Sequence, residues 1–182
     1  MVNAAMRELM QAGAAREVAN LVFVINRMTC RNLDLVLDED RPPDAPSVAS
    51  VRFETQGAKR RAVLVERAEE PRGRYPYDEE ALRACCRIDV SRRTIVLEAD
   101  SAFTPAETMV AMTKALHLAL FSDRSAKWLF GRLEAPRWPP ASFHEGVTIT
   151  LAQAVGTRLT KSRVSLGQET LAWIYFALKE RH

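Results

Sequence analysis

The tetrapeptide TPAE, Thr104 to Glu107, is the strongest local signal in the chain and sets the start of a helix. A threonine before the helix, a proline at its first position and a glutamate at its third form a capping box. The helix is predicted to run from Pro105 to about Phe121, and two adjacent stripes of its surface are apolar. A helix of this kind is buried on most sides, so other elements of the fold have to cover it.

Residues 33–98 are rich in strand signals. Leucines at every second position from 33 to 37 are typical of a half-buried strand. The segments VASVRFET and RAVLVER predict an antiparallel hairpin with Gly57 at its turn, and RRTIVLEA predicts a further strand. Prolines at 42, 43 and 46 indicate a loop, and Asp78 is expected to cap a short helix. We expect an antiparallel or mixed sheet of about four to five strands in residues 33–98.

The rest of the chain is predicted to be mainly helical. Before residue 29 the apolar residues recur at helical spacing, although residues 16–28 contain LVFVI, which is also typical of a strand. A short helix is predicted from Ser125. Two more follow from the apolar spacing in 147–159 and from SLGQ, a second capping box that begins at Ser165. The expected fold class is α+β, with an N-terminal helical segment, the sheet and a helical C-terminal half.

Length and composition fit a single globular domain, residues 1–182, that is strand-rich at 33–98 and helical at 104–182. The net charge is only +3, from 26 basic and 23 acidic residues, so no strongly charged partner is indicated. No apolar run approaches the ~18 residues of a membrane span, and no basic segment precedes the first apolar run as in a signal peptide. The three cysteines form no CxxC pair, which favours a reducing compartment. We expect a cytoplasmic protein without a cofactor.

His117 lies within the apolar surface of the predicted helix, and we interpret it first as a hydrogen-bonded core histidine. The order of strand, capped loop and helix with a central histidine also resembles the core of HExxH zinc metallopeptidases. In that family a histidine and a glutamate stand where this sequence has Thr113 and Lys114. The resemblance covers roughly residues 88–160 and implies a degenerate metallopeptidase fold that has lost its catalytic motif. Its metal-ligand candidates would be His117 and Glu145, since catalytic zinc takes three protein ligands.

Aromatic and arginine side chains are interleaved in WLFGRLEAPRW, which leads into a proline-rich loop. This combination is typical of protein interfaces and stacking platforms. The interface candidates are Trp128, Phe130, Arg132, Arg137 and Trp138. They predict a protein partner.

The predicted C-terminal helical pair supports a third interpretation. Ala152 and Gly156 have the offset of the first helix and turn in a helix-turn-helix. Basic residues follow in the region where phosphate contacts would be made. These nucleic-acid candidates are Arg158, Lys161 and Arg163.

The sequence contains no complete catalytic constellation. It has no glycine-rich phosphate loop, no nucleophile elbow and no paired-carboxylate motif. His144 and Glu145 are neighbours, but adjacent residues on a loop point apart, so we interpret them as an exposed polar loop. The leading hypothesis is a non-enzymatic binding protein, an adaptor or a subunit of a larger assembly. The degenerate metallopeptidase and a nucleic-acid-binding protein are the alternatives.

Overall fold

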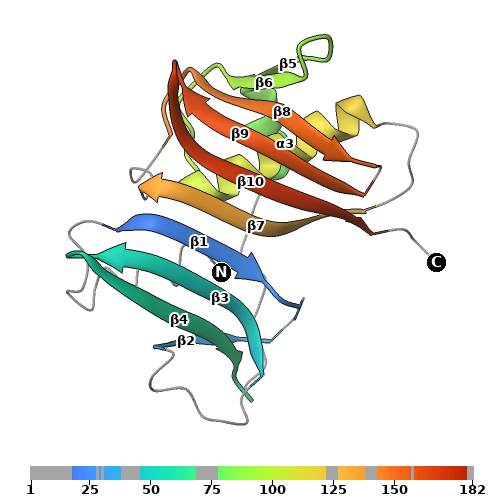
Figure 1. The fold of residues 1–182 in the computed structure, drawn as a ribbon. Helices are drawn as coiled ribbons and strands as arrows, with labels where there is room; N and C mark the ends of the chain where they lie inside the picture. The colour runs from blue at the N-terminus through green and yellow to red at the C-terminus, as the bar shows by residue number, and fades with distance from the viewer. Residues whose placement is uncertain are drawn as a thin grey trace. The chain divides into compact units, whose positions relative to one another are not determined.

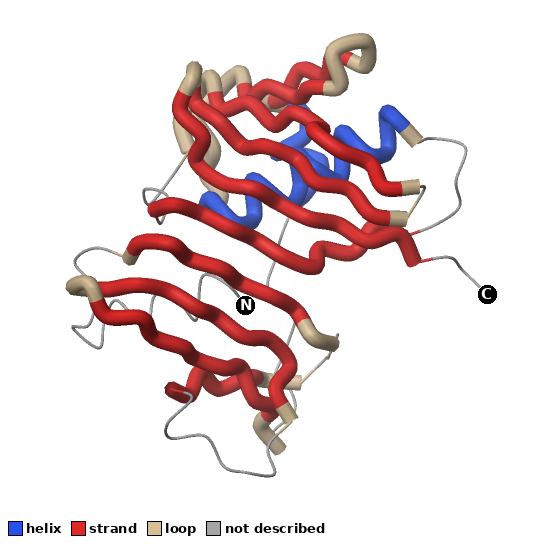
Figure 2. Tube along the Cα trace, viewed as in Figure 1, coloured by secondary structure: helices blue, strands red, loops and turns tan. Residues whose placement is uncertain are grey.

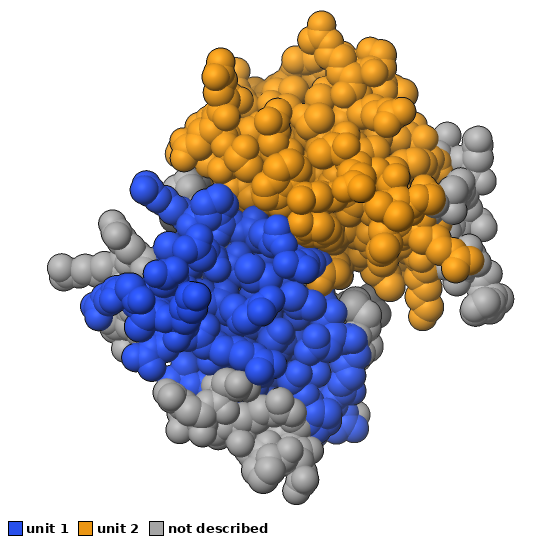
Figure 3. Space-filling model, viewed as in Figure 1, with its two compact units in different colours: residues 1–76, 132–138 blue, residues 77–131, 139–182 orange. Residues whose placement is uncertain are grey.

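The structure is a computed structural model that describes residues 18–27, 29, 31–37, 46–68, 78–121, 127–137, 143–156 and 158–179. The chain divides into two compact units (Figure 3). Unit 1 comprises residues 1–76 and 132–138, and unit 2 comprises residues 77–131 and 139–182. Strand β7 (Lys127–Arg137) contributes residues to both units. The single domain expected from the sequence stays a prediction.

Unit 1 is an antiparallel sheet. Its strands are β1 (Ala19–Ile25), β2 (Leu33–Leu37), β3 (Ser47–Thr55), β4 (Ala58–Glu66) and the second half of β7. Their order is β2-β4-β3-β1-β7 (Figure 1). The predicted hairpin is confirmed: β3 and β4 are joined by Gln56 and Gly57, which both have positive φ. A two-residue hairpin turn of type I′ requires this backbone conformation.

Strand β1 resolves the alternatives left open for residues 16–28. Residues 19–25 form a strand between β3 and β7, in which the buried Leu21 and Phe23 alternate with more exposed neighbours. Aromatic and β-branched side chains fit such a pleated, half-buried surface. The helix predicted at the start of the chain falls on residues 1–17, which lie outside the described residues.

Unit 2 packs one long helix against an antiparallel sheet. Its elements are α2 (Glu79–Ala84), β5 (Cys86–Asp89), β6 (Thr94–Leu97), α3 (Pro105–Leu120), the first part of β7, β8 (Val147–Val155), β9 (Leu159–Leu166) and β10 (Glu169–Lys179). The strand order is β5-β6-β8-β9-β10-β7. Figure 2 shows α3, in blue, along one face of these strands, where it contacts β5, β6 and β8.

Helix α3 begins where the sequence predicts. The backbone N–H of Glu107 donates to the hydroxyl of Thr104, and the backbone N–H of Thr104 donates to the Glu107 carboxylate at 3.0 Å. The helix is buried along most of its length, as its two apolar stripes require. Neither α2 nor α3, the helices of the described residues, is long and apolar enough to cross a membrane.

The expected fold class is wrong. The described residues contain ten strands and two helices, and the observed strand pairs are antiparallel. The strands extend far beyond residues 33–98, and the described part of the region 104–182 holds one helix and four strands instead of a helical half. The helices predicted from Ser125, in 147–159 and from Ser165 are β7, β8 and the hairpin of β9 and β10.

The error has a physical cause in the buried faces of these strands. In β8 the buried residues alternate from Val147 to Leu151, but small residues after them gave an apparent helical spacing. In β9 the buried face carries Thr160 and Ser162, so the apolar alternation that indicates a strand is missing. The sequence SLGQ is not a helix cap: Gly167, with a φ of 57°, lies in the turn between β9 and β10.

Candidate active site around His117

His117 lies in the last turn of α3 and is fully buried in unit 2, with 0% of its surface exposed. Aromatic rings surround it. The ring centroid of Trp128 on β7 lies 4.3 Å from that of His117, Phe176 on β10 lies at 5.3 Å and Phe121 at 6.0 Å. Phe130 packs in turn on Phe176, with 5.8 Å between centroids. We call Phe121, Trp128, Phe130 and Phe176 the aromatic cage.

The imidazole of His117 has no hydrogen-bond partner among the described residues, although both of its nitrogens are buried. Burial lowers the pKa of His117 from 6.5 to about 4, because the apolar surroundings disfavour the charged form. The ring is therefore neutral at pH 7, with one nitrogen able to donate a hydrogen bond and the other able to accept one. His117 is a core residue, as predicted, but it lacks the hydrogen bonds expected of one.

Two hydroxyls on β9 share this condition. Thr160 Oγ1 and Ser162 Oγ are buried and have no hydrogen-bond partner among the described residues. Thr160 pairs across the sheet with Phe176, a member of the aromatic cage, and Ser162 pairs with Ile174. Directly opposite residues of an antiparallel pair project from the same face. Both hydroxyls therefore face the interior that contains His117. Neither hydroxyl is among the candidate residues predicted from the sequence. Their signal in the sequence is two polar residues at alternate positions of a segment between apolar ones.

The metallopeptidase interpretation is wrong. The described residues contain no group of three His, Cys, Asp or Glu side chains that could hold a metal ion. Thr113 donates to the backbone carbonyl of Met109 at 2.7 Å, and Lys114 forms an ion pair with Glu79. Cage side chains occupy the surroundings of His117, where a metal would need further ligands.

The backbone of Glu145 and the side chain of His144 contact Asp100. The backbone N–H of Glu145 donates to Asp100 at 3.1 Å, and His144 Nδ1 lies 3.2 Å from the Asp100 carboxylate. These two hydrogen bonds lower the pKa of Asp100, the one from Glu145 contributing most. The side chains of His144 and Asp100 are both more than two-thirds exposed, so the pair is a solvated surface contact.

Four of the interface candidates lie on strand β7, and their part in an interface stays a prediction. Trp128 is buried against His117, and Phe130 packs on Phe176. In unit 1, Arg132 forms an ion pair with Glu134 on the same strand. Arg137 is exposed at the end of β7, and Trp138 lies outside the described residues.

The nucleic-acid candidates lie on or beside strand β9, and not on a helix. Arg158 lies in the connection between β8 and β9, and Lys161 and Arg163 lie on the outer face of β9. Lys161 Nζ sits 4.3 Å above the ring of Trp173. Because residues 147–179 contain no helix among those described, the helix-turn-helix interpretation is wrong.

The thiol of Cys86 is not an activated nucleophile. It donates to the backbone carbonyl of Leu82 at 3.3 Å. Burial, with smaller contributions from Cys85 and Glu98, raises the pKa of Cys86 to about 11. Since the thiolate is the reactive form of cysteine, this group stays protonated and unreactive at neutral pH.

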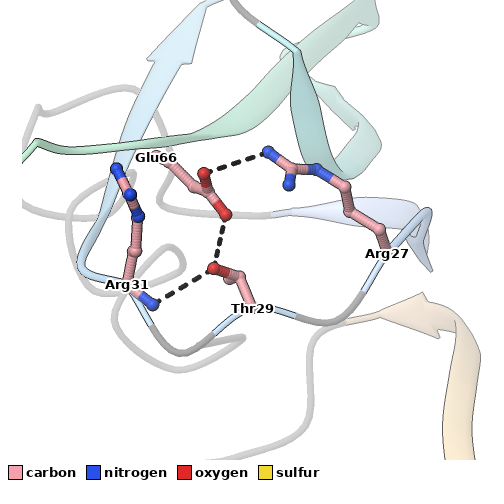
Figure 4. Close-up of polar contacts among 4 residues, drawn as sticks. All are labelled: Arg27, Thr29, Arg31 and Glu66. Atoms are coloured by element: carbon pink, nitrogen blue, oxygen red, sulfur yellow. Dashed lines mark hydrogen bonds and ion pairs between the residues drawn. The ribbon is translucent and has the colours of Figure 1, made fainter.

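Unit 1 contains a polar cluster in which each carboxylate oxygen of Glu66 is bonded (Figure 4). Thr29 donates to one oxygen, and Arg27 pairs with the other at 3.2 Å. The backbone N–H of Arg31 donates to the Thr29 hydroxyl at 3.1 Å. The hydrogen bond from Thr29 is the largest of the contributions that lower the pKa of Glu66. The cluster ties the connection between β1 and β2 to the end of β4.

The sequence matches no protein-family model and no curated protein. Solved structures resemble the chain. A pyran synthase domain from module nine of the sorangicin pathway is 15% identical, with a TM-score of 0.43, over 98% of this chain and 83% of that chain. A dehydratase domain from the CurF module of curacin polyketide synthase is 10% identical, with a TM-score of 0.40, over 98% and 81%. A conserved protein with a hot dog fold from Alicyclobacillus acidocaldarius is 9% identical, with a TM-score of 0.42, over 100% and 84%. Three further solved structures that resemble the chain are named thioesterases.

The leading hypothesis of a non-enzymatic adaptor is wrong. It relied on the lack of a complete catalytic motif in the sequence and on an aromatic and arginine loop. That loop is instead strand β7, and its first aromatic side chain, Trp128, is buried.

Proposed function

We propose that the protein is an enzyme that eliminates water from a hydroxyacyl thioester, or adds water in the reverse direction, with His117 as the group that moves the proton. One observation carries this proposal: a neutral, fully buried imidazole whose two nitrogens have no partner among the described residues. A buried polar group of this kind costs free energy in a purely structural role. A bound substrate with polar atoms would satisfy it.

In the proposed reaction His117 is the single group that carries the proton. His117 would accept the proton from the carbon next to the thioester carbonyl, while the electron pair moves towards the carbonyl oxygen. It would then deliver the same proton to the departing hydroxyl, which leaves as water as the carbon–carbon double bond forms. The apolar surroundings disfavour an isolated imidazolium, but they strengthen its attraction to the negative charge that develops on the substrate. The cation is therefore stabilised only while the substrate carries this charge.

The aromatic cage would hold the acyl chain, since its surface is apolar and its members come from the C-cap of α3 and from the sheet of unit 2. We propose a thioester as the substrate because similar structures include a thioesterase. We propose elimination as the reaction because they also include a dehydratase domain. We also place this activity in the cytoplasm, where Cys85 and Cys86, which are free thiols, would stay reduced.

The test uses 3-hydroxyoctanoyl N-acetylcysteamine as substrate and follows the ultraviolet absorbance of the conjugated enoyl product. His117→Phe and His117→Gln are expected to lower the rate at least ~100-fold, the usual contribution of a positioned acid–base group. His144→Gln is the matched control, because His144 is exposed and should leave the rate unchanged. An unchanged rate in both His117 variants would overturn the proposal, as would release of free thiol without enoyl product.

A further inference from the structure

The two buried hydroxyls of β9 are as unusual as His117. Thr160 is 4% exposed and Ser162 is 0% exposed, and neither hydroxyl has a hydrogen-bond partner among the described residues. Serine and threonine hydroxyls rotate freely and normally find a nearby backbone or side-chain partner. Other buried hydroxyls of unit 2 do so: Thr108 is bonded to Ser101 at 2.8 Å, and Thr113 to the carbonyl of Met109.

The register places these hydroxyls on the interior face of the sheet. Ser162 lies between Leu151 of β8 and Ile174 of β10, which are both buried. Thr160 lies directly opposite Phe176, whose ring makes an edge-to-face contact with His117. Opposite residues in such a pair have Cβ atoms about 4.5–5.5 Å apart. The hydroxyl of Thr160 is thus one side chain removed from the imidazole.

The proposed reaction leaves a task that His117 does not perform. The imidazole of His117 serves the carbon-bound proton and the leaving hydroxyl, whereas negative charge develops on the carbonyl oxygen of the thioester. An oxygen that gains charge in an apolar site needs hydrogen-bond donors fixed in advance. Thr160 and Ser162 provide two hydroxyl donors of this kind, two residues apart on a rigid strand.

We propose that Thr160 and Ser162 bind the carbonyl oxygen of the acyl thioester and are substrate-contacting residues of unit 2. This inference rests on the proposed function, which supplies the thioester. It assigns specificity to β9: ligands with a carbonyl oxygen at the head of an apolar chain bind better than ligands of the same length without one. Each hydroxyl donates its hydrogen to the oxygen, and the oxygen accepts both.

The experiment compares two unreactive probes by calorimetry on the full chain: S-octanoyl N-acetylcysteamine and its thioether analogue S-octyl N-acetylcysteamine. The probes differ only by the carbonyl oxygen. The unmodified protein is expected to bind the thioester about tenfold more tightly than the thioether, the effect of one to two net hydrogen bonds. Thr160→Val with Ser162→Ala should remove this preference and leave the affinity for the thioether unchanged. Thr148→Val is the matched control, because its hydroxyl donates to the carbonyl of Gly146.

The outcomes separate this inference from the proposed function. If the double variant keeps the tenfold preference while His117→Phe abolishes elimination, the assignment of Thr160 and Ser162 is wrong and the proposed function stands. If the preference depends on the two hydroxyls but no elimination is found, the oxygen-binding site stands and the proposed reaction fails. Equal binding of both probes to the unmodified protein would overturn the assignment. So would a lower melting temperature in the double variant with an unchanged preference, because this result indicates buried waters bonded to the hydroxyls.

Discussion

The two ends of α3 differ in whether their buried polar groups are hydrogen-bonded. At the start of the helix, Thr104 and Glu107 cap each other's backbone, and one turn later the buried Thr108 is bonded to Ser101. At the end of the helix, His117 is as deeply buried as Thr108, yet its nitrogens have no partner among the described residues. Both ends belong to one rigid helix in one unit, so the contrast does not arise from a general failure to pair polar groups.

The difference separates a structural end from a candidate active end. Buried polar groups are hydrogen-bonded in nearly all native structures, and the exceptions concentrate at sites that bind or react. The first end is stabilised by its polar groups. The second end carries a free-energy cost that a ligand would relieve. Substitutions at the two ends should therefore change the free energy of unfolding in opposite directions.

The largest effect is expected from pH. The pKa of His117 is about 4 in the folded protein and 6.5 without burial, so below pH 6.5 the unfolded chain binds a proton that the native state refuses. Acidification therefore favours unfolding, and the stability is lost as pH falls from 6.5 to about 4. The contribution is about 3 kcal/mol between pH 7 and pH 4. Urea denaturation at the two pH values measures it.

The control for the pH experiment is His117→Phe. Carboxylates also titrate in this range, since the pKa values of Asp89 and Asp100 are lowered in the folded protein. Only the part of the pH dependence that disappears in the variant belongs to His117. If the unmodified protein and the variant lose the same free energy of unfolding on acidification, the imidazole is not desolvated as described.

The second prediction concerns the same variant at pH 7. Phenylalanine keeps an aromatic ring in the cage and removes two buried polar atoms without partners. We expect the free energy of unfolding to rise by about 2 kcal/mol, the cost of one unsatisfied buried group less some overpacking. Chemical denaturation measures this change, and enzyme assays should show that the stabilised protein has lost its activity. A fall in the free energy of unfolding would mean that His117 has a structural hydrogen-bond partner, as Thr108 has.

The structural end of α3 could be predicted from sequence, and the candidate active end could not. A capping box is a local pattern, so Thr104 and Glu107 were sufficient to set the start of the helix. The hairpin at Gly57 was equally local, because a two-residue turn with positive φ restricts the residue type. The burial of His117 also followed from its neighbours along the same helix.

The aromatic cage is assembled from residues that are distant in the chain. Phe121 follows the end of α3, and Trp128 and Phe176 lie on two strands, so their meeting depends on a strand order that no local pattern encodes. In β10 the outward positions are aromatic as well, with Trp173 and Tyr175 between buried residues, so no period of two is visible. In β9 the polar residues that obscured the strand are the hydroxyls of the candidate site. In β9 the prediction failed because the buried face departs from the apolar alternation of a simple core.

The third prediction tests the structural end with Thr108→Val. The substitution removes the buried hydrogen bond to Ser101 and keeps the shape of the side chain. We expect the free energy of unfolding to fall by about 1 kcal/mol, with the rate of elimination unchanged. The two substitutions are therefore expected to change the free energy of unfolding in opposite directions. Thr108→Val should lower it and His117→Phe should raise it, as measured by the same denaturation experiment. A stabilising effect at Thr108 would remove the distinction between the two ends.

The smallest effect is expected midway along α3, where Lys114 pairs with Glu79 of α2. The side chains of Lys114 and Glu79 are 31% and 42% exposed, so water and salt compete with their attraction. Lys114→Met should lower the free energy of unfolding by about 0.5 kcal/mol at low salt, and the loss should fade at high salt. Polar groups that contact water, as this pair does, contribute less to stability than the buried groups at the two ends of α3. A loss as large as that of Thr108→Val, and independent of salt, would show that Lys114 is effectively buried. The structural end would then extend to the turn that precedes His117.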